Sequence, residues 1–289
     1  MKNIINSILY KIDNFININR YNLEVGSYAI QGRRDHMEDT KRIVKINLSK
    51  ITNCYLIILC DGHSGSKCSK YVVSILPKIL EKVLQDLKPN ENLKYVNKLL
   101  TKVILKIDSI YEKYNDLSGT TCVFSIFLDD KLYIVNIGDS RCIISNLTNN
   151  INLETIDHKP DLPKEYQRII KNNGNIYNFD VPRVYITELV HGLAISRVIG
   201  DIHYKQKNIV IANPDIYVRP NLSDNEFMVL ASDGLWDVMS NLEVTKFVSS
   251  KIKKMSLKMI SKKLVEHAFQ KGSMDNITVI IVSISQKTT

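Results

Sequence analysis

Acidic residues stand where apolar segments of this chain begin or end. Residues 55–60 form an apolar run without polar alternation, which is typical of a strand buried on both faces, and the run ends at Asp61-Gly62-His63. An aspartate carboxylate is a hard oxygen ligand for a cation, and a histidine can exchange a proton near neutral pH. One such Asp-Gly pair is usually only a turn, so its recurrence elsewhere in the chain decides the interpretation.

The pattern recurs at three more places. Asp233 follows a second apolar run, whereas Asp275 and the pair Glu38-Asp39 each precede one. Acids that follow two strands and precede two others lie at the same sheet edge if the strands run antiparallel. Carboxylates so close together repel one another unless cations lie between them. The spacing therefore predicts a metal site at this edge.

Length and composition fit a globular chain with a full core. Of its 289 residues, 44% are hydrophobic and 24% charged, and the composition shows no linker, so one domain is expected over residues 23–289. No apolar run approaches ~20 residues, so a membrane span is not expected. The five cysteines lack Cys-x-x-Cys spacing and are expected to be reduced core thiols of an intracellular protein, cytoplasmic and/or nuclear.

The formal net charge of +9 leaves three partner classes open: nucleic acid, an acidic membrane surface and phosphorylated substrates. The lysines are spread along the chain without the dense basic clusters and interleaved aromatic residues of a nucleic-acid groove. We therefore expect no nucleic-acid partner and interpret the charge as weak steering toward phosphate-bearing partners.

Residues 1–22 form an N-terminal segment whose apolar residues, from Ile4 to Ile16, recur at helical spacing. Three interpretations compete: a helix packed on the domain, a membrane-surface or targeting helix, and a partner-binding helix. We favour the packed helix, because the segment lacks the Arg and Ser richness of a transit peptide and has no lipidation signal.

The rest of the chain divides into strand-like and helical segments. The strands fall into two antiparallel clusters, and apolar periodicity predicts helices over residues 66–87, 93–110, 163–172, 242–248 and 257–269. Pro77 predicts a kink or break in the first helix, and Asn90 is expected to open the second. The irregular pattern of residues 174–192 suggests a surface flap. Two packed sheets flanked by helices account for this order, whereas a doubly wound parallel sheet would need strict alternation of strand and helix.

Seven motifs follow one another along the chain: Arg34-x-x-Met37-Glu38-Asp39, Asp61-Gly62-His63-x-Gly65, Ser118-Gly-Thr-Thr, Gly138-Asp-Ser-Arg141, Leu193-Ala-x-Ser-Arg-x-x-Gly-Asp201, Ala231-Ser-Asp-Gly-Leu-Trp-Asp-Val238 and Ser273-x-Asp-Asn-Ile-Thr278. Together, in this order, they closely resemble the metal-dependent PP2C protein phosphatases, from about Leu23 to the C-terminus. The resemblance implies an α+β fold, a four-layer α-β-β-α sandwich of two mainly antiparallel sheets flanked by helices. It also implies two Mg²⁺ or Mn²⁺ ions in the active site, with a weaker third ion.

The resemblance further implies which residues hold the ions. Asp61 would bridge the first two ions. The other ligands would be divided between them, with Glu38 and the carbonyl of Gly62 on one ion, and Asp233 and Asp275 on the other. Asp39 would hold metal-bound water. Asp139 and Asp237 match the acids that line the third site together with Asp233.

The implied reaction is hydrolysis of phosphoserine and phosphothreonine monoesters by in-line attack of a metal-bridged hydroxide. Arg34 would bind the substrate phosphate, and His63 would act as general acid for the serine or threonine alkoxide, which is a poor leaving group without a proton. The expected substrates are phosphorylated proteins, and the expected state is a monomer. Departures from the family pattern, such as Ser64 in place of a frequent glycine and extra residues over 185–191, leave the ligand positions intact and concern the flap.

Two rival interpretations can be weighed. Gly200-Asp-Ile-His203 looks like the first motif of the calcineurin-like metallophosphoesterases, but their motifs Gly-Asp-x-x-Asp-Arg-Gly and Gly-Asn-His-Glu are missing, so we interpret His203 as a surface or flap residue. The alternative of a catalytically weak PP2C-like scaffold or binding protein would be expected to lack metal ligands. None of the matching ligand positions is substituted.

Overall fold

The computed structural model describes residues 16–18, 21–51, 54–128, 131–186 and 192–286. Within these residues one sheet has six strands in the order β1-β2-β16-β15-β9-β10, and a second has five in the order β14-β8-β7-β4-β3. Neighbouring strands in both sheets pair antiparallel. The strands of the first sheet are β1 Ile16–Ile18, β2 Tyr21–Ile30, β16 Ile277–Gln286, β15 Glu226–Ala231, β9 Arg141–Asn146 and β10 Ile151–Glu154. Those of the second are β14 Asp215–Arg219, β8 Lys131–Ile137, β7 Cys122–Leu128, β4 Cys54–Cys60 and β3 Thr40–Ile46.

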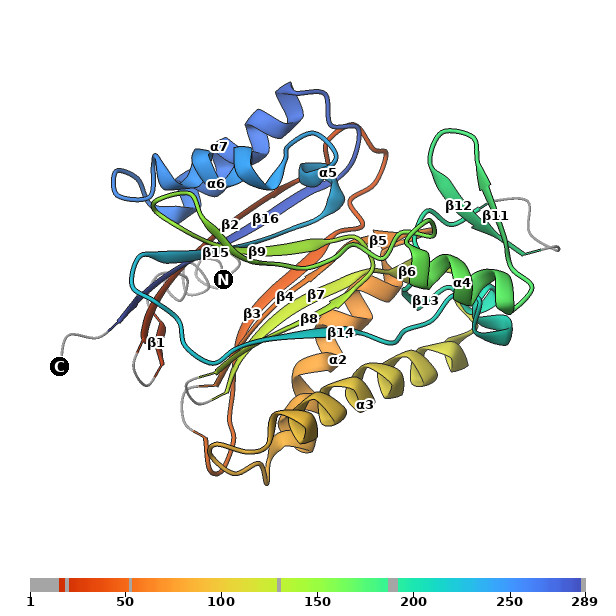
Figure 1. The fold of residues 1–289 in the computed structure, drawn as a ribbon, viewed down its shortest axis with the longest axis horizontal. Coiled ribbons are helices and arrows are strands. Elements are labelled where there is room, and N and C mark those ends of the chain that lie inside the picture. The colour runs from red at the N-terminus through yellow and green to blue at the C-terminus, as the bar shows by residue number, and fades with distance from the viewer. Residues whose placement is uncertain (1–15, 19–20, 52–53, 129–130, 187–191, 287–289) are drawn as a thin grey trace, which may run out of the picture.

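The two sheets pack face to face, and helices cover their outer faces (Figure 1). Helices α2 Lys67–Leu84 and α3 Leu93–Tyr111 lie on the second sheet; α5 Asp233–Trp236, α6 Asn241–Ser249 and α7 Leu257–Gln270 lie on the first. The expected four-layer sandwich of antiparallel sheets between helices is therefore confirmed.

Strand β4 shows why its sequence has no polar alternation. Leu56 and Ile58 belong to the core beneath α2 and α3, whereas Ile57 and Leu59 belong to the core between the sheets. All four side chains are fully buried, because successive residues of a strand point to opposite faces and both faces are covered here. The central strand can therefore hold the residue that follows it, Asp61, in a fixed position.

Smaller elements gather at one end of the sandwich. A short sheet joins β5 Gly62–His63, β6 Gly119–Thr120 and β13 Ile199–Gly200. Helix α4 Pro163–Lys171 and the hairpin of β11 Asn175–Asn178 and β12 Pro182–Tyr185 lie beside it (Figure 1). The 3₁₀ helices are η1 Glu112–Tyr114 and η2 Ile202–Asn208. The flap expected over residues 174–192 thus contains this hairpin, and residues 187–191 of it lie outside the described residues.

The structure corrects the prediction of an N-terminal helix where it describes that segment. Residues 16–18 form strand β1, and β2 already begins at Tyr21, so the helix predicted over residues 1–22 does not extend that far. Residues 1–15 lie outside the described residues. The apolar spacing misled because Ile16 and Ile18 alternate with Asn17, which also fits the two-residue period of a strand.

Two helix details also differ from expectation. Helix α2 continues through Pro77 instead of breaking there. Proline cannot donate to the carbonyl of Val73 four residues earlier, and Nη1 of Arg42 donates to that carbonyl at 3.4 Å. The N-cap of α3 is Asn92, whose side chain accepts from the N–H of Lys94, and not Asn90.

All five cysteines are buried and free of disulfides, as expected of core thiols. None of the helices described in this structure has the length and apolar character needed to cross a membrane.

Candidate active site

A cavity of about 690 Å³ opens where the acid-bearing ends of the strands meet. Antiparallel pairing places the end of β4 beside the start of β3, and the end of β15 beside the start of β16, as the spacing predicted. Nine of the ten residues proposed from the sequence line the cavity: Arg34, Glu38, Asp61, Gly62, His63, Asp139, Asp233, Asp237 and Asp275. The tenth, Asp39, is buried beside it, with Oδ2 accepting from Oγ of Ser232 at 2.9 Å.

Threonine side chains fix the backbone at Asp61. The carbonyl of Asp61 accepts from Oγ1 of Thr120 and from the N–H of Thr121, both at 2.9 Å. The N–H of Asp61 donates to Oγ1 of Thr121 at 3.2 Å. The Ser118-Gly-Thr-Thr motif therefore acts as the support of Asp61.

Burial and neighbouring negative charges raise the pKa of three of these carboxylates. Burial, followed by the charges of Asp39, Asp233 and other acids, raises the pKa of Asp61 well above its usual value. Burial and the charges of Asp139 and Asp237 do the same to Asp233. Burial also raises the pKa of Asp39 to about 6. The side chains thus lie close enough for their charges to interact, although they come from four strand ends.

Two basic side chains reach into this acidic group. Nη2 of Arg34 lies 2.6 Å from Oδ2 of Asp275, and Nζ of Lys159 pairs with Oδ2 of Asp139. Across the residues that the structure describes, no three His, Cys, Asp or Glu side chains are grouped as they would be around a bound metal ion. Asp275 and Asp139 instead pair with these two basic groups.

The acidic group nevertheless has carboxylate oxygens that suit a hard divalent cation as ligands. Oδ1 of Asp39 and Oδ1 of Asp233 are buried and have no hydrogen-bond partner among the described residues. A buried carboxylate oxygen without a partner is costly, and Mg²⁺ and Mn²⁺ prefer oxygen ligands. The residues present therefore fit the cations that the resemblance implies.

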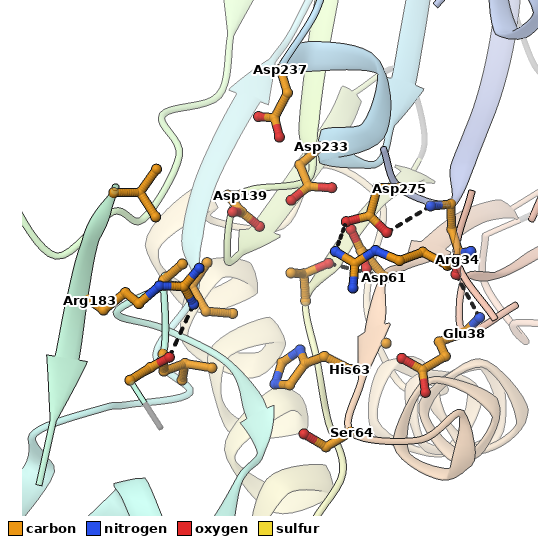
Figure 2. Close-up of a pocket in the computed structure, with 18 of the residues that line it drawn as sticks. Arg34, Glu38, Asp61, His63, Ser64, Asp139, Arg183, Asp233, Asp237 and Asp275 are labelled. Carbon is orange, nitrogen blue, oxygen red and sulfur yellow. Dashed lines mark hydrogen bonds and ion pairs between the residues drawn. The ribbon is translucent and has the colours of Figure 1, made fainter. Parts of the chain in front are cut away.

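His63 lies below the aspartates in the view of Figure 2, next to Ser64. Its Nε2 contacts Oδ2 of Asp201, which is buried at the end of β13. Burial works to lower the pKa of His63, but the charge and the hydrogen bond of Asp201 outweigh it and raise that pKa. The motif containing Asp201 was noted in the sequence, but no role was predicted for this residue.

Gly119 leaves room for the contact between His63 and Asp201. A Cβ at this position would lie 2.3 Å from Oδ2 of Asp201 and 2.5 Å from Nε2 of His63. These separations are too short for any side chain at residue 119. The glycine of the Ser118-Gly-Thr-Thr motif is thus explained by the close approach of two other side chains.

The family model for "Protein phosphatase 2C" matches residues 23–277 of this chain. The chain belongs to the protein phosphatase 2C (PP2C) family. The bovine protein "Protein phosphatase 1L" is 38% identical over 267 residues, which cover 89% of this chain and 71% of that protein. A rice "Protein kinase and PP2C-like domain-containing protein" is 32% identical, covering 90% of this chain and 39% of that protein.

Solved structures share the fold of this PP2C chain. The crystal structure of a serine-threonine phosphatase 2C from Toxoplasma gondii has a TM-score of 0.75 at 22% identity and covers 94% of this chain and 97% of that one. The resemblance found in the sequence is thus confirmed for the family and the fold. The residue roles that it implies remain predictions.

Several residues of this PP2C site were not singled out from the sequence. Lys159 and Asp201 approach predicted site residues only in the folded chain, as described above. Arg183, on β12, faces the cavity from the side opposite Arg34 (Figure 2) and donates to the carbonyl of Gly192 at 3.2 Å. Its sequence signal was lost in the irregular pattern of the flap.

The histidines outside the catalytic prediction have different surroundings. His36 is exposed and lines the cavity. His158 is buried away from it, where its Nδ1 accepts from the N–H of Gly138 at 3.0 Å and so supports the loop of Asp139. His203 is exposed on η2, in agreement with its interpretation as a surface residue.

Proposed function

We propose that this chain is a Mg²⁺- or Mn²⁺-dependent protein serine/threonine phosphatase that hydrolyses phosphoserine and phosphothreonine monoesters of proteins, acting as a monomer. The observation that carries the proposal is the convergence of Asp61, Asp233 and Asp275 in one cavity. It is supported by the mutual rise of the pKa values of Asp61 and Asp233, which a divalent cation would reverse.

The proposed ligands are those implied by the family pattern. Asp61 would be shared by two ions, with Glu38 and the carbonyl of Gly62 on one side, and Asp233 and Asp275 on the other. When bound, the ions would supply an activated water for attack on phosphorus and positive charge beside the phosphoryl oxygens. Asp39, buried next to Asp61, would help to orient that water.

Arg34 would hold the substrate phosphate. Its side chain is 60% exposed, and among the described residues its Nη2 pairs with Oδ2 of Asp275. A guanidinium has five N–H donors, so the contact with Asp275 leaves donors for phosphate oxygens and also fixes the direction of the side chain. Arg34 would thus link the phosphate to one of the proposed metal ligands.

His63 would donate a proton to the leaving serine or threonine oxygen. Because Asp201 holds Nε2, the ring has a fixed orientation, and Nδ1 is the nitrogen left for the substrate. The raised pKa keeps a larger fraction of the imidazole protonated near neutral pH, which an acid catalyst needs.

The test is hydrolysis of a phosphothreonine peptide and of p-nitrophenyl phosphate by the purified chain, with Mn²⁺, with Mg²⁺ and with a chelator. We expect turnover only with metal, and Asp61→Asn should remove nearly all of it. Asp86→Asn, at an exposed acid in the turn after α2, is the matched control and should retain full activity. Full turnover in chelator would reject the metal mechanism, and metal binding without turnover would favour the scaffold.

A further inference from the structure

Lys159 supplies a positive charge to the part of the cavity proposed for a third ion. Its Nζ pairs with Oδ2 of Asp139, and Asp233 and Asp237 add to the negative charge around its ammonium. These three acids are the ones assigned to the third site by the family pattern. Lys159 therefore places a positive charge of the protein itself beside these three acids.

The backbone around this pair is held firmly. The N–H of Gly138 donates to Nδ1 of His158, and the N–H of His158 donates back to the carbonyl of Gly138 at 2.9 Å. Gly138 precedes Asp139, and His158 precedes Lys159. One set of hydrogen bonds thus fixes both the acid and the base of the pair.

The ammonium itself is less restrained than its backbone. The side chain of Lys159 is 36% exposed, whereas that of Asp139 is 5% exposed. A lysine carries its charge on a flexible four-carbon stem, so the ammonium can leave Asp139 toward solvent without a backbone change. Asp139 would then be a buried carboxylate without its partner, which is unfavourable unless another cation replaces the ammonium.

We propose that Lys159 is a built-in cation of the third acidic site, and that its ammonium must leave Asp139 before a third divalent ion can bind. An ammonium and a divalent ion beside the same carboxylate repel each other, so the binding of one disfavours the binding of the other. The third site would therefore be weak because a cation of the chain already occupies it. The inference rests on the proposed function, in which the neighbouring acids bind metal.

Manganese binding to the chelator-stripped chain, measured by isothermal titration calorimetry, tests the proposal without an activity assay. Lys159→Met removes the charge and keeps the stem, and it should bind the third Mn²⁺ about tenfold tighter or more than the wild type does. Lys159→Arg keeps the charge and should behave as the wild type. Lys164→Met, an exposed lysine on α4, is the matched control and should also be unchanged.

Thermal unfolding gives a second measurement. Without metal, Lys159→Met should be less stable than the wild type, because Asp139 loses its partner, and Mn²⁺ should raise its Tm by more than it raises that of the wild type. When Asp139→Asn is combined with Lys159→Met, the gain in manganese affinity of Lys159→Met should be lost.

Equal affinity for the third ion in the wild type and in Lys159→Met would overturn the proposal. Unchanged manganese binding with a raised KM for phosphopeptide would also overturn it and assign Lys159 to the substrate. A wild-type chain that binds no Mn²⁺ at all would reject the proposed function and this inference together, so the two failures are distinguishable.

Discussion

Nε2 of His63 lies 2.5 Å from Oδ2 of Asp201, although 138 positions separate the two residues in the chain. Asp201 is held in turn by its own N–H, which donates to the carbonyl of Ser118, and it follows Gly200, whose N–H donates to Oδ1 of Asp108 at 2.9 Å. Helix α3, through Asp108, thus helps to fix the residue that orients the proposed acid. The orientation of His63 is therefore a property of the fold and not of its own loop alone.

Asp201→Asn should weaken proton donation while leaving the loop intact. Residue 201 has a φ of +50°, a conformation that asparagine tolerates well. We expect kcat for a phosphothreonine peptide to fall about tenfold or more, with a smaller loss for p-nitrophenyl phosphate, whose leaving group hardly needs a proton. In a His63→Ala background the same change should have little further effect. Equal losses for both substrates would count against the positioning role.

Arg34→Ala should mainly weaken phosphate binding. We expect KM for the phosphopeptide to rise about tenfold or more, because charge-assisted bonds to phosphate oxygens are lost. Arg42→Ala is the control, since Arg42 contacts the carbonyl of Val73 in α2 instead of the cavity. The measurement is the steady-state KM for the phosphopeptide in both variants. A KM unchanged by Arg34→Ala would exclude a role of Arg34 in phosphate binding.

Glu165→Gln should destabilise the fold without touching the cavity. Burial pushes the pKa of Glu165 upward, but hydrogen bonds from Arg197, Ser196 and Arg168 outweigh it and hold that pKa at about 2. Removing one member of such a buried ionic network costs roughly 3 kcal/mol near neutral pH.

The pH dependence of this effect follows from the lowered pKa. The stability that Glu165 contributes is present above its unfolded-state pKa and is lost as the pH falls toward about 2. Urea unfolding should therefore show a large difference between wild type and Glu165→Gln at neutral pH that shrinks in acid. Glu112→Gln, at an exposed position, should show neither effect. A difference that stays constant with pH would contradict the assignment.

The metal-free chain should lose stability as the pH rises. Asp39 has a folded pKa of about 6, and those of Asp61 and Asp233 are also raised. A carboxyl whose pKa is raised by folding contributes stability that is complete below its unfolded pKa and is lost as the pH passes through the folded pKa.

Calorimetry in chelator should therefore give a lower Tm at about pH 8 than at about pH 5, and Mn²⁺ should recover the loss at the higher pH. Asp61→Asn should flatten part of this dependence, because the amide does not titrate. A metal-free Tm that rises over the same range in the wild type, with no response to Mn²⁺, would show that the acids do not repel one another as described.

The acidic positions could be predicted because antiparallel pairing determines which strand ends meet. Asp61 follows β4, and Asp275 precedes β16, so their meeting needed only the strand directions. Lys159 and Asp201 could not be placed in this way, because they lie in irregular segments whose path depends on buried contacts such as those of His158 and Asp108.

Local rules also failed where distant residues changed the outcome. Pro77 does not break α2, and the carbonyl that it leaves without a helical donor accepts from Arg42 of β3. The strands β11 and β12 were not predicted, because their hairpin does not follow a regular alternation of buried apolar and exposed polar residues. Phe179, for example, is apolar but 81% exposed. The acids of the site, with Arg34 and His63, were therefore predictable from the sequence. The cavity residues Lys159 and Arg183 and the positioning residue Asp201 were not.

The most direct test of the account is a crystal of the chain soaked in Mn²⁺ and examined by anomalous scattering. We predict two strong peaks among the carboxylates of Asp61, Asp233 and Asp275 and the side chain of Glu38, with Asp61 in contact with both ions. A well-ordered crystal with these side chains in place and no peak among them would contradict the metal-dependent mechanism.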